Sequence, residues 1–284
     1  MLLGAHVSIA GGVELAPSRA KDLGCDVMQI FSKNQRQWRS SPLKQESIDG
    51  YKKGVEAASL GPTLVHCSYL LNCASPDDAA WTKSWQGLVD EVQRADQLGI
   101  PFVTFHPGSP QDKGSAWGCK RVGDAVASAL EATKGTKPMI LLETNAGQGA
   151  AVGRTFAELA QMRDAVPAPL RKRVGVCFDT CHVFVSGYPI HTEDGYADAF
   201  DTFENEIGLE HLKAFHLNDS LVDFDSKKDR HALIGTGKLG LEPFRWLLND
   251  KRFAQHPGYL ETPVEDENGY AGELKTLRKL IPKK

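Results

Sequence analysis

The chain has 284 residues, which is enough for two small domains or for one large α/β barrel. Hydrophobic residues make up 41% and charged residues 24% of it, as is usual for a globular protein with a large core, so disorder is excluded. The formal charge of -3 argues at first against a nucleic-acid partner, because proteins that bind nucleic acid usually carry a basic surface.

Eight short apolar segments, spaced along the chain, predict β-strands. They are residues 2–7, 27–31, 63–66, 102–106, 139–143, 174–179, 212–217 and 258–261. Between them lie stretches with helical spacing of polar and apolar positions, such as residues 80–98, 121–133, 155–165, 197–206 and 242–249. A strand followed by a helix, repeated about eight times, predicts an α/β protein with a single (β/α)8 TIM barrel.

The sequence has no Pro/Gly/Ser-rich linker that would separate two halves. The longest irregular segments are expected to be single loops, such as residues 218–239. We therefore expect one catalytic domain over residues 1–284. An open doubly wound sheet is the alternative, and the lack of a Gly-rich dinucleotide turn after the first predicted strand disfavours it.

The first residues do not resemble a signal peptide, because they lack a basic segment and are interrupted by His6 and Glu14. No apolar run approaches the ~20 residues that a membrane span requires. The six cysteines are scattered without the density of a disulfide scaffold. These features predict a cytoplasmic protein with reduced cysteines, and we take a monomer as the default state.

Side chains that can bind metals stand at or next to the ends of six of the eight predicted strands: His66, His106, Glu143, Asp179, His216 and Glu261. In a barrel, all strand C-termini open onto one face, so these residues converge there. A single histidine or carboxylate at a strand end is more often structural, but a buried group of them without cations would be costly to desolvate. The pattern therefore predicts a metal cluster at the C-terminal face of the strands.

Three further candidates lie in loops on the same face. Asp179 and His182 are three apart just after a strand, so both can point inward over one turn. Asp229 and His231 are two apart in an extended loop and project to the same side. Basic residues surround this second pair, so a solvated charged loop is the alternative interpretation for it.

Five imidazoles and four carboxylates form a donor set that suits Zn2+ or Mn2+ better than Mg2+ or Ca2+. Cys177 and Cys181 flank Asp179, but we interpret them as small buried residues and not as zinc ligands. Three divalent ions would change the formal charge from -3 to about +3, which weakens the argument against a nucleic-acid partner.

Several longer segments resemble the endonuclease IV family of abasic-site (AP) endonucleases. They are GAHVS (4–8), KNQRQW (33–38), HCSYLLN (66–72), HPGS (106–109), ETNAGQG (143–149), GVCFDTCHVFVSGY (175–188), HLNDS (216–220) and DRHALIGTG (229–237). The resemblance spans almost the whole chain and keeps the order of the family's motifs. It implies a (β/α)8 barrel with about three zinc ions, with Mn2+ as an alternative at one or more sites.

The resemblance also implies how the nine ligands are shared between three ions. His66 and His106 would hold the first ion, which Glu143 would bridge to the second. Asp179, His216 and Glu261 would complete the second site. His182, Asp229 and His231 would hold the third ion.

The resemblance implies a DNA-repair enzyme that cuts duplex DNA 5′ to abasic sites. We expect a hydroxide bridging the Glu143-linked metal pair to attack the phosphate, leaving a 3′-hydroxyl and a 5′-deoxyribose phosphate. Glu143 and Glu261 are the candidate catalytic residues, and activity on damaged 3′ ends is expected as well. Arg36, Tyr69 and Leu70 are the candidate DNA contacts, because side chains inserted between base steps open the duplex; capping of the barrel is the alternative role for Tyr69 and Leu70.

Two other function classes compete with this interpretation. A sugar isomerase or epimerase on a similar barrel would use two metals held mostly by carboxylates. A DNA-damage binding protein with structural zinc would have closed, usually Cys-rich sites. The histidine-rich donor set and the DRH loop favour phosphodiester chemistry over both.

Overall fold

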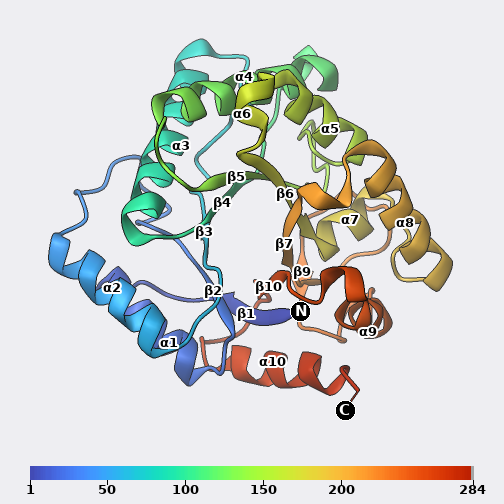
Figure 1. Ribbon diagram of the computed structural model, residues 1–284. Coiled ribbons are helices and arrows are strands. Elements are labelled where there is room, and N and C mark those ends of the chain that lie inside the picture. Colours follow the sequence, from blue (N-terminus) through green and yellow to red (C-terminus); the bar gives the residue numbers. More distant parts are fainter. Residues whose placement is uncertain (283–284) are drawn as a thin grey trace.

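The computed structural model describes residues 1–282, and its centre is a closed barrel of eight parallel strands (Figure 1). Around the barrel the strands follow the order β1-β10-β7-β6-β5-β4-β3-β2. Their bounds are β1 (Leu2–His6), β2 (Val27–Ile30), β3 (Leu64–His66), β4 (Phe102–Phe105), β5 (Met139–Glu143), β6 (Val174–Asp179), β7 (Leu212–His216) and β10 (Pro257–Leu260). The predicted TIM barrel is confirmed.

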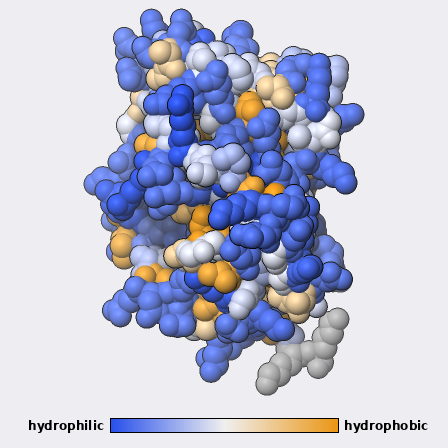
Figure 2. All heavy atoms as spheres, turned by 90° about the vertical axis from the view of Figure 1, so that its left-hand side faces the viewer, coloured by the Kyte–Doolittle hydropathy of each residue, from blue (hydrophilic) through white to orange (hydrophobic). Residues whose placement is uncertain are grey.

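Helices surround the barrel in Figure 1, as expected for strands whose outer faces are apolar. Their bounds are α1 (Ala16–Asp22), α2 (Gln45–Ala57), α3 (Asp78–Leu98), α4 (Ser115–Ala132), α5 (Phe156–Ala165), α6 (Ala168–Arg171), α7 (Thr180–Ser186), α8 (Glu193–Glu206), α9 (Glu242–Asn249) and α10 (Gly269–Lys279). The face turned to the viewer in Figure 2 is mostly hydrophilic, with small hydrophobic patches between polar side chains. No helix within residues 1–282 is long and apolar enough to cross a membrane.

Capping residues explain why two helices begin earlier than predicted. Helix α3 starts after Asp77, whose side chain accepts a hydrogen bond from the backbone N–H of Ala80. Helix α8 starts after Thr192, which caps the N–H of Gly195 in the same way. Helix α4 starts at Ser115, six residues before the predicted start, and no side chain caps it, so no local signal marks this end.

The segment expected to be one irregular loop, residues 218–239, contains a small antiparallel hairpin. Strands β8 (Asp219–Ser220) and β9 (His231–Ala232) pair through Asp219 with Ala232 and Ser220 with His231. The Asp219 carboxylate accepts hydrogen bonds from the backbone N–H groups of Ser220, Gly235, Gly237 and Leu239. A buried side chain therefore organises this segment, and no alternating sequence pattern announces it.

Candidate metal centre

The barrel interior is built in layers. Its apolar floor consists of Val27, Leu64, Leu141, Cys177, Ala214 and Tyr259. Because side chains alternate along a strand, the residue two positions after each of these also faces the interior. Those residues are Gln29, His66, Glu143, Asp179, His216 and Glu261, and they form a polar layer at the barrel mouth. Five of the six are predicted metal ligands.

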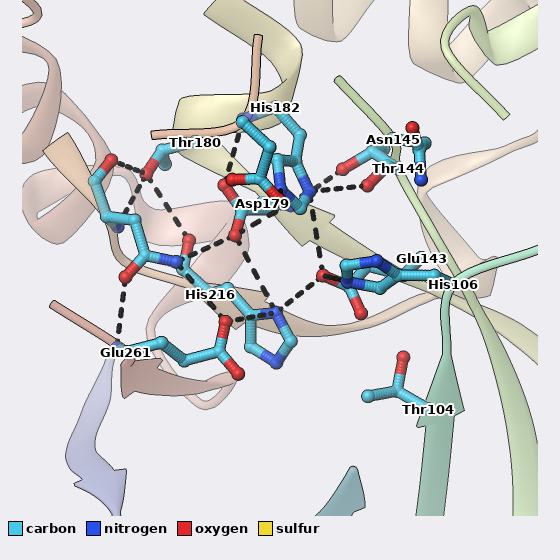
Figure 3. A network of polar contacts seen from close by, with 12 residues as sticks. Thr104, His106, Glu143, Thr144, Asn145, Asp179, Thr180, His182, His216 and Glu261 are labelled. Atoms are coloured by element: carbon cyan, nitrogen blue, oxygen red, sulfur yellow. Dashed lines mark hydrogen bonds and ion pairs between the residues drawn. The ribbon is translucent and has the colours of Figure 1, made fainter. Parts of the chain in front are cut away.

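The nine predicted ligands lie together at this mouth, and Figure 3 shows most of them pointing toward one another. Their donor atoms fall into three groups, each with all members within 4.8 Å of one another. The groups are His66, His106 and Glu143; Glu143, Asp179, His216 and Glu261; and His182, Asp229 and His231. Glu143 belongs to two of these groups, as expected of a bridging carboxylate.

Glu143 lies at the centre of the cluster, at the end of β5, with its side chain 0% exposed. Its Oε2 is 3.3 Å from His66 Nε2, and its Oε1 is 3.3 Å from His106 Nε2 and 3.0 Å from His216 Nδ1. Burial alone would raise the pKa of Glu143, but the charges of His216 and His106 hold it well below its usual range. The carboxylate is thus an anion surrounded by imidazoles.

The hairpin carries Asp229 and His231 to the mouth, against His182 of α7. The two Asp229 carboxylate oxygens lie 3.1 Å from His182 Nε2 and 3.2 Å from His231 Nε2. Burial opposes protonation, but the charges of Asp179 and Asp229 raise the pKa of His182 to about 10. For His231, burial is outweighed by the nearby carboxylates of Asp229 and Asp179, which raise its pKa to about 8. The structure therefore brings these residues together instead of leaving the pair in a solvated loop.

Three of the imidazoles are held from behind by backbone carbonyls. Nδ1 of His66 lies 2.7 Å from the Cys67 carbonyl, and Nδ1 of His182 lies 2.8 Å from that of Thr144. Nδ1 of His231 is 3.3 Å from the carbonyl of Glu261. Donation of Nδ1–H to these carbonyls turns each Nε2 toward the carboxylates, which is the usual arrangement of metal-binding histidines.

Three buried donor atoms of the cluster lie within ion-pair distance of a neighbouring group but form no hydrogen bond of normal geometry among residues 1–282: Glu143 Oε2, His182 Nε2 and His231 Nε2. Buried polar atoms are rarely left unpartnered, since each costs about 1–3 kcal/mol. A divalent cation at each group would satisfy these atoms, and the nitrogen and oxygen donors fit Zn2+ or Mn2+. The residues present therefore fit a metal cluster.

Cys181 is the one further residue whose donor atom joins a group, with Asp179 and His231. Burial, followed by the charge of Asp179, raises the pKa of its thiol. A neutral thiol is a poor zinc ligand. Cys177 belongs to the apolar floor, so both cysteines lie in buried positions as predicted.

A cavity of about 270 Å3 opens over the cluster and is lined by His6, Phe31, His66, Tyr69, His106, Asp229, His231, Glu261 and Tyr270. The predicted DNA-contact residues stand at its edge. Tyr69 is 67% exposed and Leu70 37% exposed, in the loop after β3. Arg36 lines a neighbouring groove of about 700 Å3, which shares His6, Phe31 and Tyr270 with the cavity. Exposed side chains thus surround the entrance to the donor cluster.

Three polar residues of the site were not predicted from sequence. Asn218 donates to Asp179 Oδ2 at 2.7 Å, and Gln29 donates to Glu261 Oε1 at 2.5 Å and approaches His6 Nδ1 at 2.8 Å. The search for histidines and carboxylates at strand ends passed over the amides. A signal was available, because His6 ends one apolar strand and Gln29 stands one residue before the end of the next, both in inward-facing register.

The comparisons with known proteins agree with this geometry. Residues 17–280 match a family model described as xylose isomerase-like TIM barrel. A protein named probable endonuclease 4 from Chloroflexus aurantiacus is 43% identical over 279 residues, which cover 98% of this chain and 97% of that protein. Endonuclease IV from Thermus thermophilus superimposes with a TM-score of 0.88 at 34% identity, covering 99% and 98% of the two chains. A D-tagatose 3-epimerase-like protein, at 17% identity and a TM-score of 0.72 over 99% of this chain and 98% of that chain, shares the fold alone.

The fold and the donor cluster thus define a metal-competent barrel of the xylose isomerase-like class. Within that class, the relatives above 30% identity cover nearly the whole chain. The chain belongs to the endonuclease IV family, whose members are nucleases.

Proposed function

We propose that this protein is a DNA-repair endonuclease that hydrolyses the phosphodiester bond 5′ to abasic sites in duplex DNA. The observation that carries the proposal is the convergence of nine histidine, aspartate and glutamate donors around the buried Glu143, with three donor atoms left without a hydrogen bond of normal geometry. Its products would be a 3′-hydroxyl and a 5′-deoxyribose phosphate. The same chemistry would extend to blocked 3′ ends.

We further propose that the cluster holds three divalent cations, zinc at each group or manganese at some. His66 and His106 would hold one, and Glu143 would bridge it to a second held also by Asp179, His216 and Glu261. His182 of α7 would hold the third together with Asp229 and His231. Bound cations of this kind generate a nucleophile from water near neutral pH and stabilise charge on phosphoryl oxygens and on a leaving group. The His66 and His182 backbone hydrogen bonds fix the rings for this task before substrate arrives.

Recognition of the abasic site is assigned to the loops at the cavity edge. Tyr69 and Leu70 would enter the base stack where a base is missing, because their apolar surface is exposed and gains partners there. Arg36, also exposed, would contact a phosphate of the opened duplex. The cavity behind Tyr69, which is lined by Glu261 and by the two histidines that contact Glu143, would then receive the sugar and phosphate.

The remaining features of the proposal concern the setting of the enzyme. We propose one catalytic domain over residues 1–284, located in the cytoplasm. A monomer is sufficient because every proposed ligand comes from the same barrel. Duplex DNA is the macromolecular partner. No second chain is required to complete the donor cluster.

Incision of a duplex with one tetrahydrofuran abasic analogue tests the proposed function. This analogue cannot undergo β-elimination, so a cut must come from hydrolysis. We expect one cut 5′ to the analogue, a product that a polymerase can extend, and loss of the cut when a chelator removes metal. A duplex with an intact base at that position is the matched control. Equal cutting of both duplexes, or full activity in metal-free protein, would refute the proposal.

A further inference from the structure

His216 differs from the other buried histidines of the cluster in how it is held. His66, His182 and His231 each direct Nδ1 to a backbone carbonyl and turn Nε2 to the carboxylates. His216 is reversed: its Nδ1 lies 3.0 Å from Glu143 and 3.3 Å from Glu261. Its Nε2 lies 2.7 Å from the side-chain oxygen of Gln29. The orientation of His216 therefore depends on a side chain that can be replaced.

The same amide also contacts a second predicted ligand. Gln29 Nε2 donates to Glu261 Oε1 at 2.5 Å and lies 2.8 Å from Nδ1 of His6. Glu261 keeps its other oxygen, Oε2, toward His216 Nδ1. The Gln29 amide thus holds Nε2 of His216 and Oε1 of Glu261. Both residues belong to the donor group that also contains Glu143 and Asp179.

The hydrogen bonds leave only one orientation for this amide. Its oxygen must face His216 Nε2, which is then the protonated nitrogen, and its NH2 must face the Glu261 carboxylate. A rotated amide would place its oxygen against a carboxylate oxygen. The Gln29 amide therefore determines that His216 carries its proton on Nε2 and presents the unprotonated Nδ1 to the carboxylates.

Burial makes these contacts strong. Gln29 and His216 are both 0% exposed, and Gln29 lies two residues after Val27 of the apolar floor. Water is not available to replace a lost hydrogen bond at this depth, so the amide acts as a fixed support. The fifth imidazole, His106, is 30% exposed and has no such support from a side chain within residues 1–282.

We propose that Gln29 is a positioning residue of the metal centre, which holds His216 and Glu261 in the geometry required to bind the cation they share with Glu143 and Asp179. The inference rests on the proposed metal cluster and adds a residue that is not itself a ligand. Supporting residues of this kind change metal affinity by about 10–100-fold. Its loss is expected to weaken this site and to spare the group of His182, Asp229 and His231 (the hairpin site), in which both imidazoles lie against backbone carbonyls.

Gln29→Met tests the inference, because methionine keeps the length of the side chain and removes every hydrogen bond. The matched control is Thr104→Val, which removes a buried hydroxyl from β4, where it donates to the Leu141 carbonyl and contacts no proposed ligand. Gln29→Ala is the second variant in case methionine disturbs packing. Full-length proteins loaded with Zn2+ are mixed with a chromogenic chelator, and zinc release is followed beside thermal unfolding of the metal-free proteins.

We expect Gln29→Met to release about one zinc equivalent at least ten times faster than wild type, with metal-free unfolding close to that of Thr104→Val. Thr104→Val is expected to release zinc as wild type does. In zinc-loaded wild type, nitrogen-15 spectra are expected to show His216 protonated at Nε2 with slow proton exchange, and fast exchange in Gln29→Met.

Wild type that holds about three equivalents, with unchanged release from both Gln29 variants, would overturn the role of Gln29 and leave the cluster standing. Equal acceleration in Thr104→Val would overturn it too, since general loosening of the barrel would then explain the effect. Wild type that holds no zinc would overturn the cluster and, with it, this inference.

Discussion

Glu143 belongs both to the donor group of His66 and His106 and to the donor group of Asp179, His216 and Glu261. No other described residue belongs to both of these groups. Only a carboxylate can bind two cations through two equivalent oxygens while offsetting their charge. On five strands, the residue two positions before the proposed ligand belongs to the apolar floor, so these ligands stand directly above closely packed side chains. The chemistry proposed here depends on that fixed anion.

Glu143→Gln is predicted to lower the incision rate by on the order of 10³-fold, because a neutral amide offers one good acceptor and cannot hold a metal pair. Binding of abasic duplex is expected to weaken far less than incision, since the exposed loops and the donors His182, Asp229 and His231 are untouched. Incision and binding are measured side by side, with the exposed Glu242→Gln as control. Incision within tenfold of wild type would remove Glu143 from the bridging role.

The pKa values of the hairpin site predict proton release on metal binding. In the metal-free protein the pKa of His182 is raised to about 10 and that of His231 to about 8, so both carry a proton at pH 7. A cation binds neutral imidazoles and must displace these protons. Affinity is therefore expected to rise with pH and to level off for His231 above about pH 8.

Calorimetric titration with Zn2+ in two buffers of different ionisation enthalpy checks this prediction. At pH 7, wild type is expected to release about two protons more than His231→Ala, which lacks the hairpin site. Equal proton release by the two proteins, or an affinity that does not change between pH 6 and pH 8, would contradict the assignment.

The sequence alone predicted which residues lie at the barrel mouth better than it predicted which of them lie next to one another. The convergence of residues such as His66 and Asp179 could be predicted because they combine a metal-competent side chain with a strand end. The proposed grouping of donors depends on three-dimensional contacts such as that of Asp229 with His182, and only the family resemblance implied this grouping at the level of sequence. Gln29 was missed because an amide in an apolar strand resembles an ordinary buried polar residue.

Among the elements, the β8–β9 hairpin has the least support from regular structure, because each of its strands is two residues long. The Asp219 side chain stabilises the hairpin instead, because it accepts four backbone hydrogen bonds, two on each carboxylate oxygen. The position of Asp229 and His231 at the mouth therefore depends on a residue that does not contact the cluster.

Asp219→Asn is predicted to destabilise the protein by about 2–4 kcal/mol, since an amide has one acceptor oxygen and leaves two backbone N–H groups facing its NH2. The hairpin site should lose metal first. Denaturant unfolding and zinc content are measured together, with Asp223→Asn, an exposed residue of the same segment, as the control. Unchanged stability and zinc content would show that the hairpin does not depend on Asp219.

The loop after β3 is the element proposed to open the duplex. Tyr69→Ala is predicted to weaken binding to abasic duplex by about 1–3 kcal/mol, the usual value of a base–aromatic stack, with metal content intact. Arg36→Ala is predicted to lower the slope of log affinity against log salt by about one. Trp117→Ala removes an exposed aromatic that does not line the cavity and serves as control. Unchanged affinity in both loop variants would mean that these loops only cap the barrel.

The strands were predicted well and several helices poorly, for a physical reason. Strand residues such as Val174 and Phe178 are buried on a continuous apolar surface, so their sequence shows it. Helix α7 was not predicted, because its seven residues are all buried and show no polar face. Its start is set by Asp179, which accepts a hydrogen bond from the His182 backbone N–H at 2.9 Å.

For the whole molecule, the formal charge of -3 is consistent with a DNA substrate only if cations occupy the mouth. Four of the nine proposed ligands are carboxylates, and they are concentrated where a phosphate would bind. Metal-free protein would therefore repel the substrate at the site itself. Under the proposed function, cations at the mouth would therefore favour DNA binding as well as supply the chemistry.

Stepwise return of Zn2+ to metal-free protein, with incision of abasic duplex measured at each step, tests the central claim most directly. Elemental analysis of the same samples gives the number of bound equivalents. Incision is predicted to stay low through the first two equivalents and to reach its full rate as about three are bound. Full incision at two equivalents or fewer, or zinc binding close to three without any incision, would contradict the account.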